Sequence, residues 1–252
     1  MSERDAPPVT QADIEEGVRA LGLRAGDIVE VHSSLSRFGW VEGGAATVVD
    51  ALMSVVGEEG TIVMSAFPVS KPLPSSDAER AAGLHAKVRI YGPEYAGPTG
   101  MGVIADEFRL RPGTVLGTGL HRVAAWGRER ERMRRGYGEL LAADGWALLL
   151  GVDIERCSSM HHAERVGLPP EVTACFRPPD ELRAQYPEDI FLDYGGTPER
   201  AWLKIQAEAE RQGLIRRRTI GQADCRMFRA RMVVGLYEEA LCADPLGLYG
   251  LT

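Results

Sequence analysis

Residues 27–67, DIVEVHSSLSRFGWVEGGAATVVDALMSVVGEEGTIVMSAF, decide the fold class of this chain. Two short apolar runs, Asp27–Ser33 and Thr61–Phe67, predict buried strands. The segment between them opens at Gly43-Gly44 and carries apolar residues at helical spacing. Because a strand–helix–strand unit predicts a crossover between parallel strands, we expect an α/β fold. We expect its core to be a central mixed, mostly parallel sheet flanked by helices.

The flanking sequence predicts further elements of the same kind. Thr10 and Asp13 are typical of a capped helix start. The 68–97 stretch, rich in proline, serine, glycine and alanine, indicates a long loop that is functional or mobile. The other expected helices and strands are Met101–Leu110 (helix), Leu120–Trp126 (strand), Trp146–Val152 (strand), Ser158–Val166 (helix), Glu199–Gln212 (helix) and Met227–Ala240 (helix), with irregular or edge structure over Cys175–Gly195. We expect residues 1–9 to be a flexible tail and residues 10–252 to form a single domain.

Composition excludes several classes of protein. The formal net charge of -7 argues against a nucleic-acid partner, which would favour a basic surplus. No apolar run approaches the roughly 18 residues that a membrane span needs, and the polar start MSERDAPPVT lacks the apolar region of a secretory signal. The four cysteines are widely spaced, which favours reduced thiols over a disulfide framework or a structural zinc site. We therefore expect a cytoplasmic protein.

A candidate anion site follows the first predicted strand, where the sequence is Val31-His32-Ser33-Ser34-Leu35. Ligands of α/β proteins bind at the carboxyl ends of the strands. Small hydroxyls and exposed backbone N–H groups at such a place can hold phosphate oxygens. The alternative is a strand end with turn-forming serines.

Two groups of residues are candidates for acid–base chemistry. His121 emerges from the glycine-rich run Gly117–Gly119 at the start of an apolar stretch, a suitable position for a general base. His161 and Glu164 are three residues apart on a predicted helix, so the carboxylate can orient the imidazole or share a metal with it. A hydrogen-bonded strand-end histidine and an exposed helix start are the alternatives.

Taken together, the motifs resemble those of the antibiotic N-acetyltransferase family, typified by aminoglycoside 3-N-acetyltransferases. The blocks that carry the resemblance occur in the family's order: Val31–Leu35 with Gly43-Gly44, Leu52–Phe67, Pro98–Gly102, Phe108–Gly113, His121 with Val123–Gly127, Leu148–Val152 with Ser158–Glu164, and Gly221–Ala223. Several motifs in one order are far more specific than any single motif.

The resemblance implies an acetyl-CoA-dependent N-acetyltransferase that needs no metal. Its acceptor would be an amino group of a small molecule, foremost the 3-N position of an aminoglycoside. His121 would be the general base, with Glu164 and His161 as the carboxylate and imidazole beside it. Acetyl-CoA would enter a crevice lined by His32, Ser33, Ser34, Leu35, Ser65, Phe67 and Thr118. The hydroxyls of Ser33, Ser34 and Thr118 are candidates for stabilising the oxyanion.

The sequence also departs from the family pattern. Thr118-Gly119 stands where His-Pro is usual, Arg122 where Ser is usual and Cys157 where Asn is usual. The segment between Trp126 and Trp146 is short and holds five arginines within 128–135, which would repel a polycationic acceptor and suit an anionic or neutral one. A divergent or non-catalytic CoA-binding homologue therefore stays open, as do a metal-dependent hydrolase using His121, His161 and Glu164, and a homodimer.

Overall fold

The structure is a computed structural model that describes residues 7–74, 76–77, 86–89, 95, 97–119, 121–188, 190–194 and 199–251. Within these residues the main sheet has seven strands in the order β5-β6-β2-β1-β7-β10-β9. Their bounds are β1 (Ile28–Ser33), β2 (Thr61–Ser65), β5 (Val115–Leu116), β6 (Val123–Gly127), β7 (Trp146–Leu150), β9 (Arg216–Ile220) and β10 (Ala223–Arg229). A smaller sheet pairs β3 (Ser70–Pro72), β4 (Ala86–Arg89) and β8 (Phe191–Tyr194).

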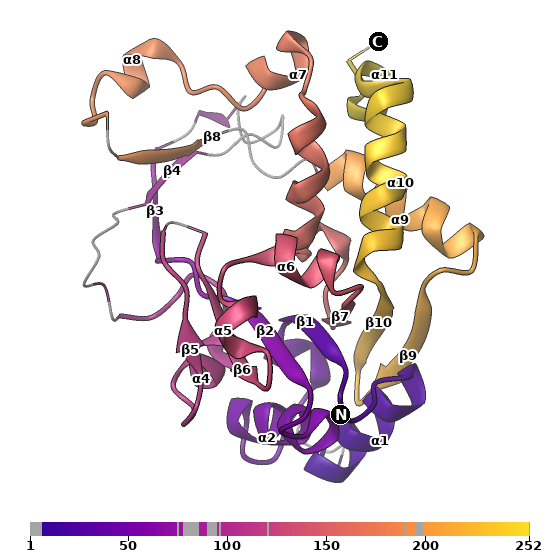
Figure 1. Ribbon diagram of the computed structural model, residues 1–252. Coiled ribbons are helices and arrows are strands. Elements are labelled where there is room, and N and C mark those ends of the chain that lie inside the picture. The colour runs from indigo at the N-terminus through magenta and orange to yellow at the C-terminus, as the bar shows by residue number, and fades with distance from the viewer. Residues whose placement is uncertain are drawn as a thin grey trace.

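Helices cover both faces of the main sheet (Figure 1). On one face α1 (Gln11–Leu21), α2 (Ala45–Val56) and α4 (Val103–Arg109) build a hydrophobic cluster with the strands. On the other face the cluster comes from α6 (Tyr137–Ala142), α9 (Glu199–Arg211), α10 (Ala230–Ala243) and the 3-10 helix η4 (Ser158–Val166). The shorter elements are α5 (Arg130–Met133), α7 (Pro170–Ala174), α8 (Asp180–Arg183), α11 (Pro245–Tyr249), η2 (Leu35–Phe38) and η3 (Ile154–Arg156). The expected α/β fold is confirmed.

The parallel part of the sheet is confined to its centre. β1 pairs in parallel with β2 and with β7, whereas β6, β10, β5 and β9 join by antiparallel pairs. The crossover predicted between β1 and β2 is therefore confirmed. The sheet is mixed, as the sequence led us to expect, but its pairing is not mostly parallel, because only the pairs of β1 are parallel. β5 and β9 join their neighbours through hairpins, which force the antiparallel sense, whereas β6 and β10 return to the sheet after long connections.

Three other expectations change in detail. Met227 and Phe228 belong to β10 and not to the last helix, since their side chains enter the hydrophobic clusters on opposite faces of the sheet. β6 begins at Val123, after His121, while Leu120 lies outside the described residues. Residues 1–6 of the expected tail also lie outside them. Val9, by contrast, is buried and bridges to Val41, so the packed chain begins before Thr10.

The predicted cap at Thr10 is confirmed. Thr10 accepts a hydrogen bond from the backbone N–H of Asp13, and the Asp13 carboxylate accepts one from the backbone N–H of Thr10. No helix in the described part of the chain has the length and apolar character needed to cross a bilayer.

The end of β6 requires a glycine. Gly127 has φ +104°, and a Cβ there would lie 2.1 Å from the carbonyl oxygen of Gly60 in the neighbouring strand connection. We expect Gly127→Ala to lower the free energy of unfolding by about 2–4 kcal/mol, from backbone strain and the steric clash together. Urea denaturation measures this. Gly213→Ala is the matched control, because φ there is +72° with no neighbour within 4 Å, and an equal loss in both variants would show that the Gly60 contact contributes nothing.

Candidate active site

Polar residues gather at one edge of the main sheet, where the central parallel strands end. β1 ends at His32 and Ser33, β2 ends at Ser65, and Gly151 follows β7. β2 and β7 flank β1 on opposite sides, so the chain order reverses at β1. Such a reversal opens a crevice at the carboxyl ends of the strands.

A cavity of about 620 Å³, here called the sheet-edge cavity, occupies this place. Among the residues that line it are His32, Ser33, Ser34, Arg37, Ser65 and Arg156. Gly151 is needed for the shape of its floor. Its φ is +71°, and a Cβ there would lie 2.5 Å from the Cβ of Arg37. A side chain at position 151 would therefore push Arg37 out of the cavity wall.

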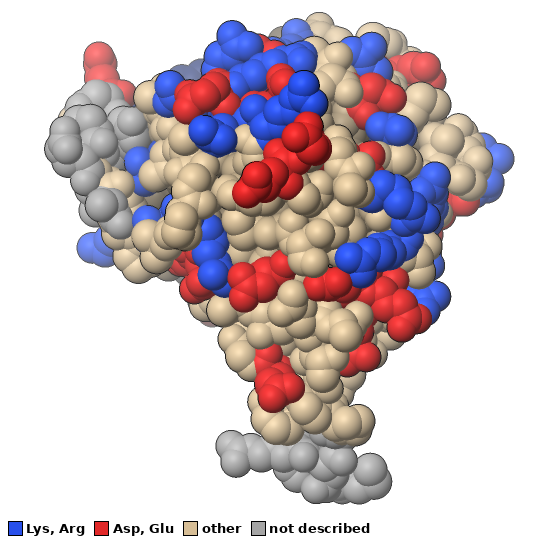
Figure 2. All heavy atoms as spheres, turned by 60° about the horizontal axis from the view of Figure 1, so that its bottom comes forward, with Lys and Arg blue, Asp and Glu red and all other residues tan. Residues whose placement is uncertain are grey.

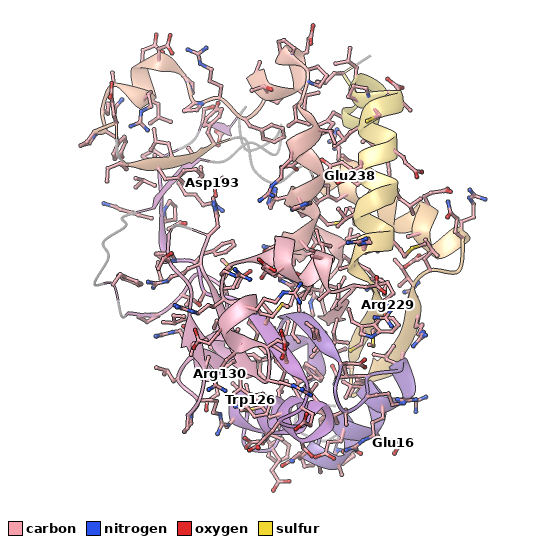
Figure 3. The ribbon with its side chains drawn as sticks, viewed as in Figure 1. Glu16, Trp126, Arg130, Asp193, Arg229 and Glu238 are labelled. Atoms are coloured by element: carbon pink, nitrogen blue, oxygen red, sulfur yellow. The ribbon has the colours of Figure 1, made fainter. Side chains whose placement is uncertain are left out.

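A second cavity of about 640 Å³, here called the histidine cavity, adjoins the first. His121, His161, His162 and Glu164 line it, and Met101, Glu155 and Arg156 line both cavities. Asp193 on β8 also lines it, so the small sheet forms one of its walls (Figure 3). Two ligands, one in each cavity, would meet near the shared residues.

His161 and Glu164 form a hydrogen-bonded dyad. Their Nδ1 and Oε2 atoms are 2.9 Å apart, and the His161 side chain is 50% exposed toward the cavity. The other carboxylate oxygen of Glu164 accepts a hydrogen bond of 3.2 Å from Tyr237, whose hydroxyl is 2.6 Å from that of Tyr249. Burial raises the pKa of Tyr237 and raises that of Tyr249 to about 12, so both phenols keep their protons. Tyr237 thus holds the Glu164 carboxylate in place. Because Glu164 contacts Nδ1 of His161, the Nε2 atom of the same ring can contact a ligand.

The remaining histidines of this cavity differ from His161 in their surroundings. His121 is exposed and makes edge-to-face ring contacts with Phe67, at 5.1 Å between centroids, and with Phe191, at 5.5 Å. Burial, and then the charge of Arg165, lower the pKa of His162 and favour its neutral form. His121, which precedes β6, and His161, on η4, therefore line the cavity from different parts of the chain.

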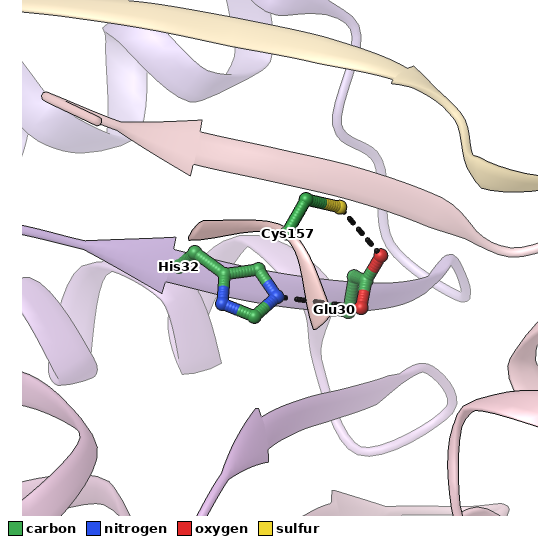
Figure 4. A group of neighbouring side chains, drawn as sticks. All are labelled: Glu30, His32 and Cys157. Atoms are coloured by element: carbon green, nitrogen blue, oxygen red, sulfur yellow. Dashed lines mark hydrogen bonds and ion pairs between the residues drawn. The ribbon is translucent and has the colours of Figure 1, made fainter. Parts of the chain in front are cut away.

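A buried carboxyl group lies beneath the junction of the two cavities. Glu30 is 0% exposed, and its Oε1 atom accepts a hydrogen bond of 3.2 Å from the thiol of Cys157 (Figure 4). The same oxygen also accepts a hydrogen bond from the hydroxyl of Ser159. Nε2 of His32 lies 3.4 Å from Glu30 and also accepts a 3.3 Å bond from the backbone N–H of Ser158. A ring nitrogen cannot donate and accept at once, so these two contacts of His32 belong to different tautomers of the ring.

Glu30, His32 and Cys157 also bring three potential metal ligands within 4.8 Å of one another. The hydrogen bonds just described already use the carboxylate oxygen, the thiol proton and the imidazole lone pair. A metal ion would have to displace all of them and ionise the thiol, whose pKa is raised well above its usual value by burial and by the charge of Glu30. The cluster therefore fits a hydrogen-bonded support better than a metal centre.

Comparisons with known proteins agree with this geometry. A family model described as aminoglycoside 3-N-acetyltransferase matches residues 31–241. The SPbeta prophage-derived aminoglycoside N(3')-acetyltransferase-like protein YokD of Bacillus subtilis (strain 168) is 31% identical, with 92% of each chain covered. The chain belongs to the aminoglycoside 3-N-acetyltransferase family.

Other relatives extend the likeness. Aminoglycoside N(3)-acetyltransferase VII of Streptomyces paromomycinus is 30% identical over 92% of this chain and 91% of its own. The crystal structure of YokD superposes with a TM-score of 0.70 at 27% identity, covering 95% of this chain and 96% of that one. AAC-IIIb, solved as a binary complex with CoASH, has the same fold, with a TM-score of 0.71 at 21% identity over 93% of this chain and 97% of its own. The family's enzymes are acyltransferases that use acetyl-CoA.

The two cavities bring together most of the residues that the sequence singled out. His32, Ser33, Ser34 and Ser65 line the sheet-edge cavity, and His121, His161, Glu164 and Phe67 line the histidine cavity. Leu35 lies beside them, in an apolar pocket of about 540 Å³ that shares Ser33 and Ser34 with the sheet-edge cavity. Thr118 is exposed and lines none of these three cavities.

The arginines of the 128–135 segment mostly have carboxylate partners. Arg132 and Arg135 bond Glu139 at 2.9 and 3.0 Å, Arg134 bonds Glu131, and Arg128 bonds Glu59. On the face shown in Figure 2, basic and acidic side chains are intermixed in the same way. Only Arg135 among these arginines lines the histidine cavity, so the repulsion expected from the sequence is much weaker in the fold.

Sequence reasoning missed two residues at the centre of the site. Glu30 is a carboxylate in an otherwise apolar strand, two positions before His32 and so on the same face of that strand. A carboxylate at this spacing from His32 indicates a polar contact between the two side chains. Tyr137 lies in the short arginine-rich segment, and nothing in the local sequence indicates that its hydroxyl reaches Ser65 at 2.6 Å.

The raised pKa of Cys157 predicts low reactivity. A higher thiol pKa leaves less thiolate at a given pH, and the thiolate is the reactive form. We expect iodoacetamide at pH 8 to modify the exposed Cys242 and to leave the buried Cys157 intact until the protein is unfolded. Peptide mass spectrometry of the alkylated native protein checks this, and rapid labelling of Cys157 would contradict the buried arrangement around Glu30.

Proposed function

We propose that this protein transfers the acetyl group of acetyl-CoA to an amino group of an aminoglycoside, at the 3-N position that gives the family its name. The observation that carries the proposal is the meeting of two cavities beside the His161–Glu164 dyad. The donor takes the sheet-edge cavity and the acceptor takes the histidine cavity. The thioester carbonyl and the amine then come together near Met101 and Ser158.

The donor side has groups suited to a phosphorylated ligand. Ser33 and Ser34 offer hydroxyls and backbone N–H groups at the end of β1, and Arg37 and Arg156 offer positive charge at the cavity wall. His32 and Ser65 lie deeper, where the thioester end of acetyl-CoA would reach. Leu35, in the apolar pocket that shares Ser33 and Ser34 with the sheet-edge cavity, extends the donor surface, whereas Phe67 lines the cavity of the acceptor and Thr118 lines neither.

The base of the reaction is His161 in this proposal. Glu164 holds Nδ1 of His161, so Nε2 can take the proton that the amine loses on attack. The resulting imidazolium is stabilised by the same carboxylate. His121, which the sequence favoured as the base, contacts the acceptor from the opposite wall between Phe67 and Phe191.

The acceptor side can hold a cation. Glu155, Glu164 and Asp193 line the histidine cavity and can pair with ammonium groups. Among the described residues, four cationic side chains line the cavity, those of Lys87, Arg135, Arg156 and Arg165. Contacts join Lys87 to Asp193, Arg135 to Glu139 and Arg156 to Glu155. An ammonium group of an aminoglycoside can therefore take the place of one of these cations beside a carboxylate.

The test is release of CoA thiol from acetyl-CoA by the purified protein. The acceptors are aminoglycosides that contain 2-deoxystreptamine, simple amines and amines that carry a carboxylate. We expect release that depends on the aminoglycoside and produces its amide. Absence of thiol release with every amine, together with no thermal shift on adding acetyl-CoA, would contradict the proposal.

We also propose a cytoplasmic location. The four free cysteines support a reducing compartment, the cytoplasm. The homodimer expected from the sequence stays a prediction, which light scattering after size exclusion would decide.

A further inference from the structure

Three hydroxyl groups from separate elements meet where the two cavities adjoin. The Ser65 hydroxyl, at the end of β2, is 2.6 Å from that of Tyr137, the first residue of α6, and 3.0 Å from that of Ser158, the first residue of η4. Ser65 lines the sheet-edge cavity, whereas Tyr137 and Ser158 line the histidine cavity. The hydroxyl cluster therefore stands between the place of the donor and the place of the acceptor.

Proton counting shows that the cluster can give one hydrogen bond to a ligand. Each hydroxyl carries one proton, and the contacts of Ser65 with Tyr137 and with Ser158 use two of the three. Ser158 also hydrogen-bonds Tyr137, so the third proton turns toward a ligand when that contact gives way. Burial and the charge of Glu30 raise the pKa of Tyr137 well above its usual value, so the phenol is a donor and not an anion. With Tyr137 donating to Ser65 and Ser65 donating to Ser158, the third proton is that of Ser158.

Ser158 is the end of this chain that faces the reaction. Ser158 and His161 are three residues apart on a 3-10 helix, where side chains at that spacing eclipse one another. The Ser158 hydroxyl and the His161 imidazole therefore lie on the same face of η4. The backbone N–H of Ser158 donates to His32 at 3.3 Å, which holds the backbone at the start of η4, and the contact with Ser65 holds the hydroxyl.

We infer that the Ser158 hydroxyl donates the hydrogen bond that stabilises the oxyanion of acetyl transfer, with Ser65 and Tyr137 as the positioning residues behind it. This inference rests on the proposed function. The amine nitrogen attacks the thioester carbon, a C–N bond forms, and the carbonyl electron pair moves to oxygen, where Ser158 donates to it. His161 takes the proton from nitrogen. The C=O bond then re-forms, the C–S bond breaks, and the leaving CoA thiolate accepts the proton from His161.

The test is the steady-state kinetics of Ser158→Ala with an acceptor that the wild type uses. A donor bonded only in the transition state changes kcat and leaves binding alone, so we expect kcat to fall by about 10²–10³-fold with KM for both substrates and Kd for CoA unchanged. Ser158→Thr, which keeps a hydroxyl, is expected to recover most of the activity. Tyr137→Phe removes the proton at the far end of the chain and is expected to lower kcat by about 2–10-fold.

The controls separate this role from a structural one. Ser54→Ala, at an exposed position on α2 away from both cavities, is expected to match the wild type. The pH profile of kcat in Ser158→Ala is expected to keep its shape, because His161 remains. If Ser158→Ala does not fold, Ser158→Cys, whose thiol is a weak donor, is measured in its place.

The inference is overturned if kcat of Ser158→Ala stays within about threefold of wild type, or if the loss appears in KM and Kd with kcat intact. A wild-type protein that transfers no acetyl group to any amine would instead defeat the proposed function. The two failures are thus distinguishable.

Discussion

Replacing His161 with alanine is expected to lower kcat by about 10²–10⁴-fold, the range for loss of a general base. His161 is the imidazole of the histidine cavity that Glu164 holds at 2.9 Å, so its loss removes both the proton acceptor and the charge that the carboxylate stabilises. Binding of CoA is expected to persist, because His161 does not line the sheet-edge cavity. Stopped-flow or steady-state turnover, with calorimetry for CoA, measures both quantities.

Two further variants test whether His161 or His121 is the general base. Glu164→Gln keeps the shape of the carboxyl group and removes its charge, so we expect a kcat between those of wild type and His161→Ala. His121→Ala is expected to act mainly on KM for the acceptor. If His121→Ala abolishes turnover while His161→Ala leaves it near the wild-type value, the base is His121, as the sequence alone favoured.

Replacing Glu30 with alanine is expected to lower the free energy of unfolding by about 3–5 kcal/mol. Glu30 is fully buried and accepts hydrogen bonds from Ser159 and Cys157, and its removal leaves these donors unpaired around a new cavity. Because His32 and the start of η4 are held by the same group, acetyl transfer is expected to fall as well. Chemical denaturation followed by tryptophan fluorescence measures the stability.

Glu59→Ala is the control for this experiment. It breaks the bond between Glu59 and Arg128, but both side chains are mostly exposed, at 78% and 66%. We expect a loss of at most about 1 kcal/mol, the value typical of exposed ion pairs. Similar losses in Glu30→Ala and Glu59→Ala would show that the hydrogen bonds of Glu30 contribute little. Glu30→Gln, which keeps the volume, is expected to lie between the two.

The parallel crossover from β1 to β2 could be predicted because its signals are local. Apolar periodicity and the flanking glycines identify β1, α2 and β2 in the sequence. A crossover through a helix then requires the two strands to run parallel. The outer strands could not be placed in this way. Met227 and Phe228 resemble the apolar face of a helix, and only their pairing with β7 reveals that they are strand residues.

The residues of the candidate site also divide into those that local sequence patterns predict and those that depend on long-range contacts. Motif order was enough to identify the former as candidates, because Ser33 and Ser34 lie at the end of a predictable strand and His161 and Glu164 lie on a predictable helix. The choice between His121 and His161 depends on the Glu164 contact and on Tyr237 behind it, which comes from a helix 73 residues away along the chain. Long-range contacts of this kind also bring Tyr137 to Ser65, 72 residues apart, and no spacing in the sequence predicts them.

The central claim is that the acetyl group moves from CoA to an amine at the junction of the two cavities. Acetyl-CoA labelled with ¹³C in its carbonyl, incubated with a 2-deoxystreptamine aminoglycoside and followed by NMR, tests it most directly. We expect a labelled amide on the 3-amino nitrogen with the wild type and a strongly reduced amide signal with His161→Ala. Labelled free acetate in place of the amide, or label that stays in acetyl-CoA with every acceptor, would contradict it.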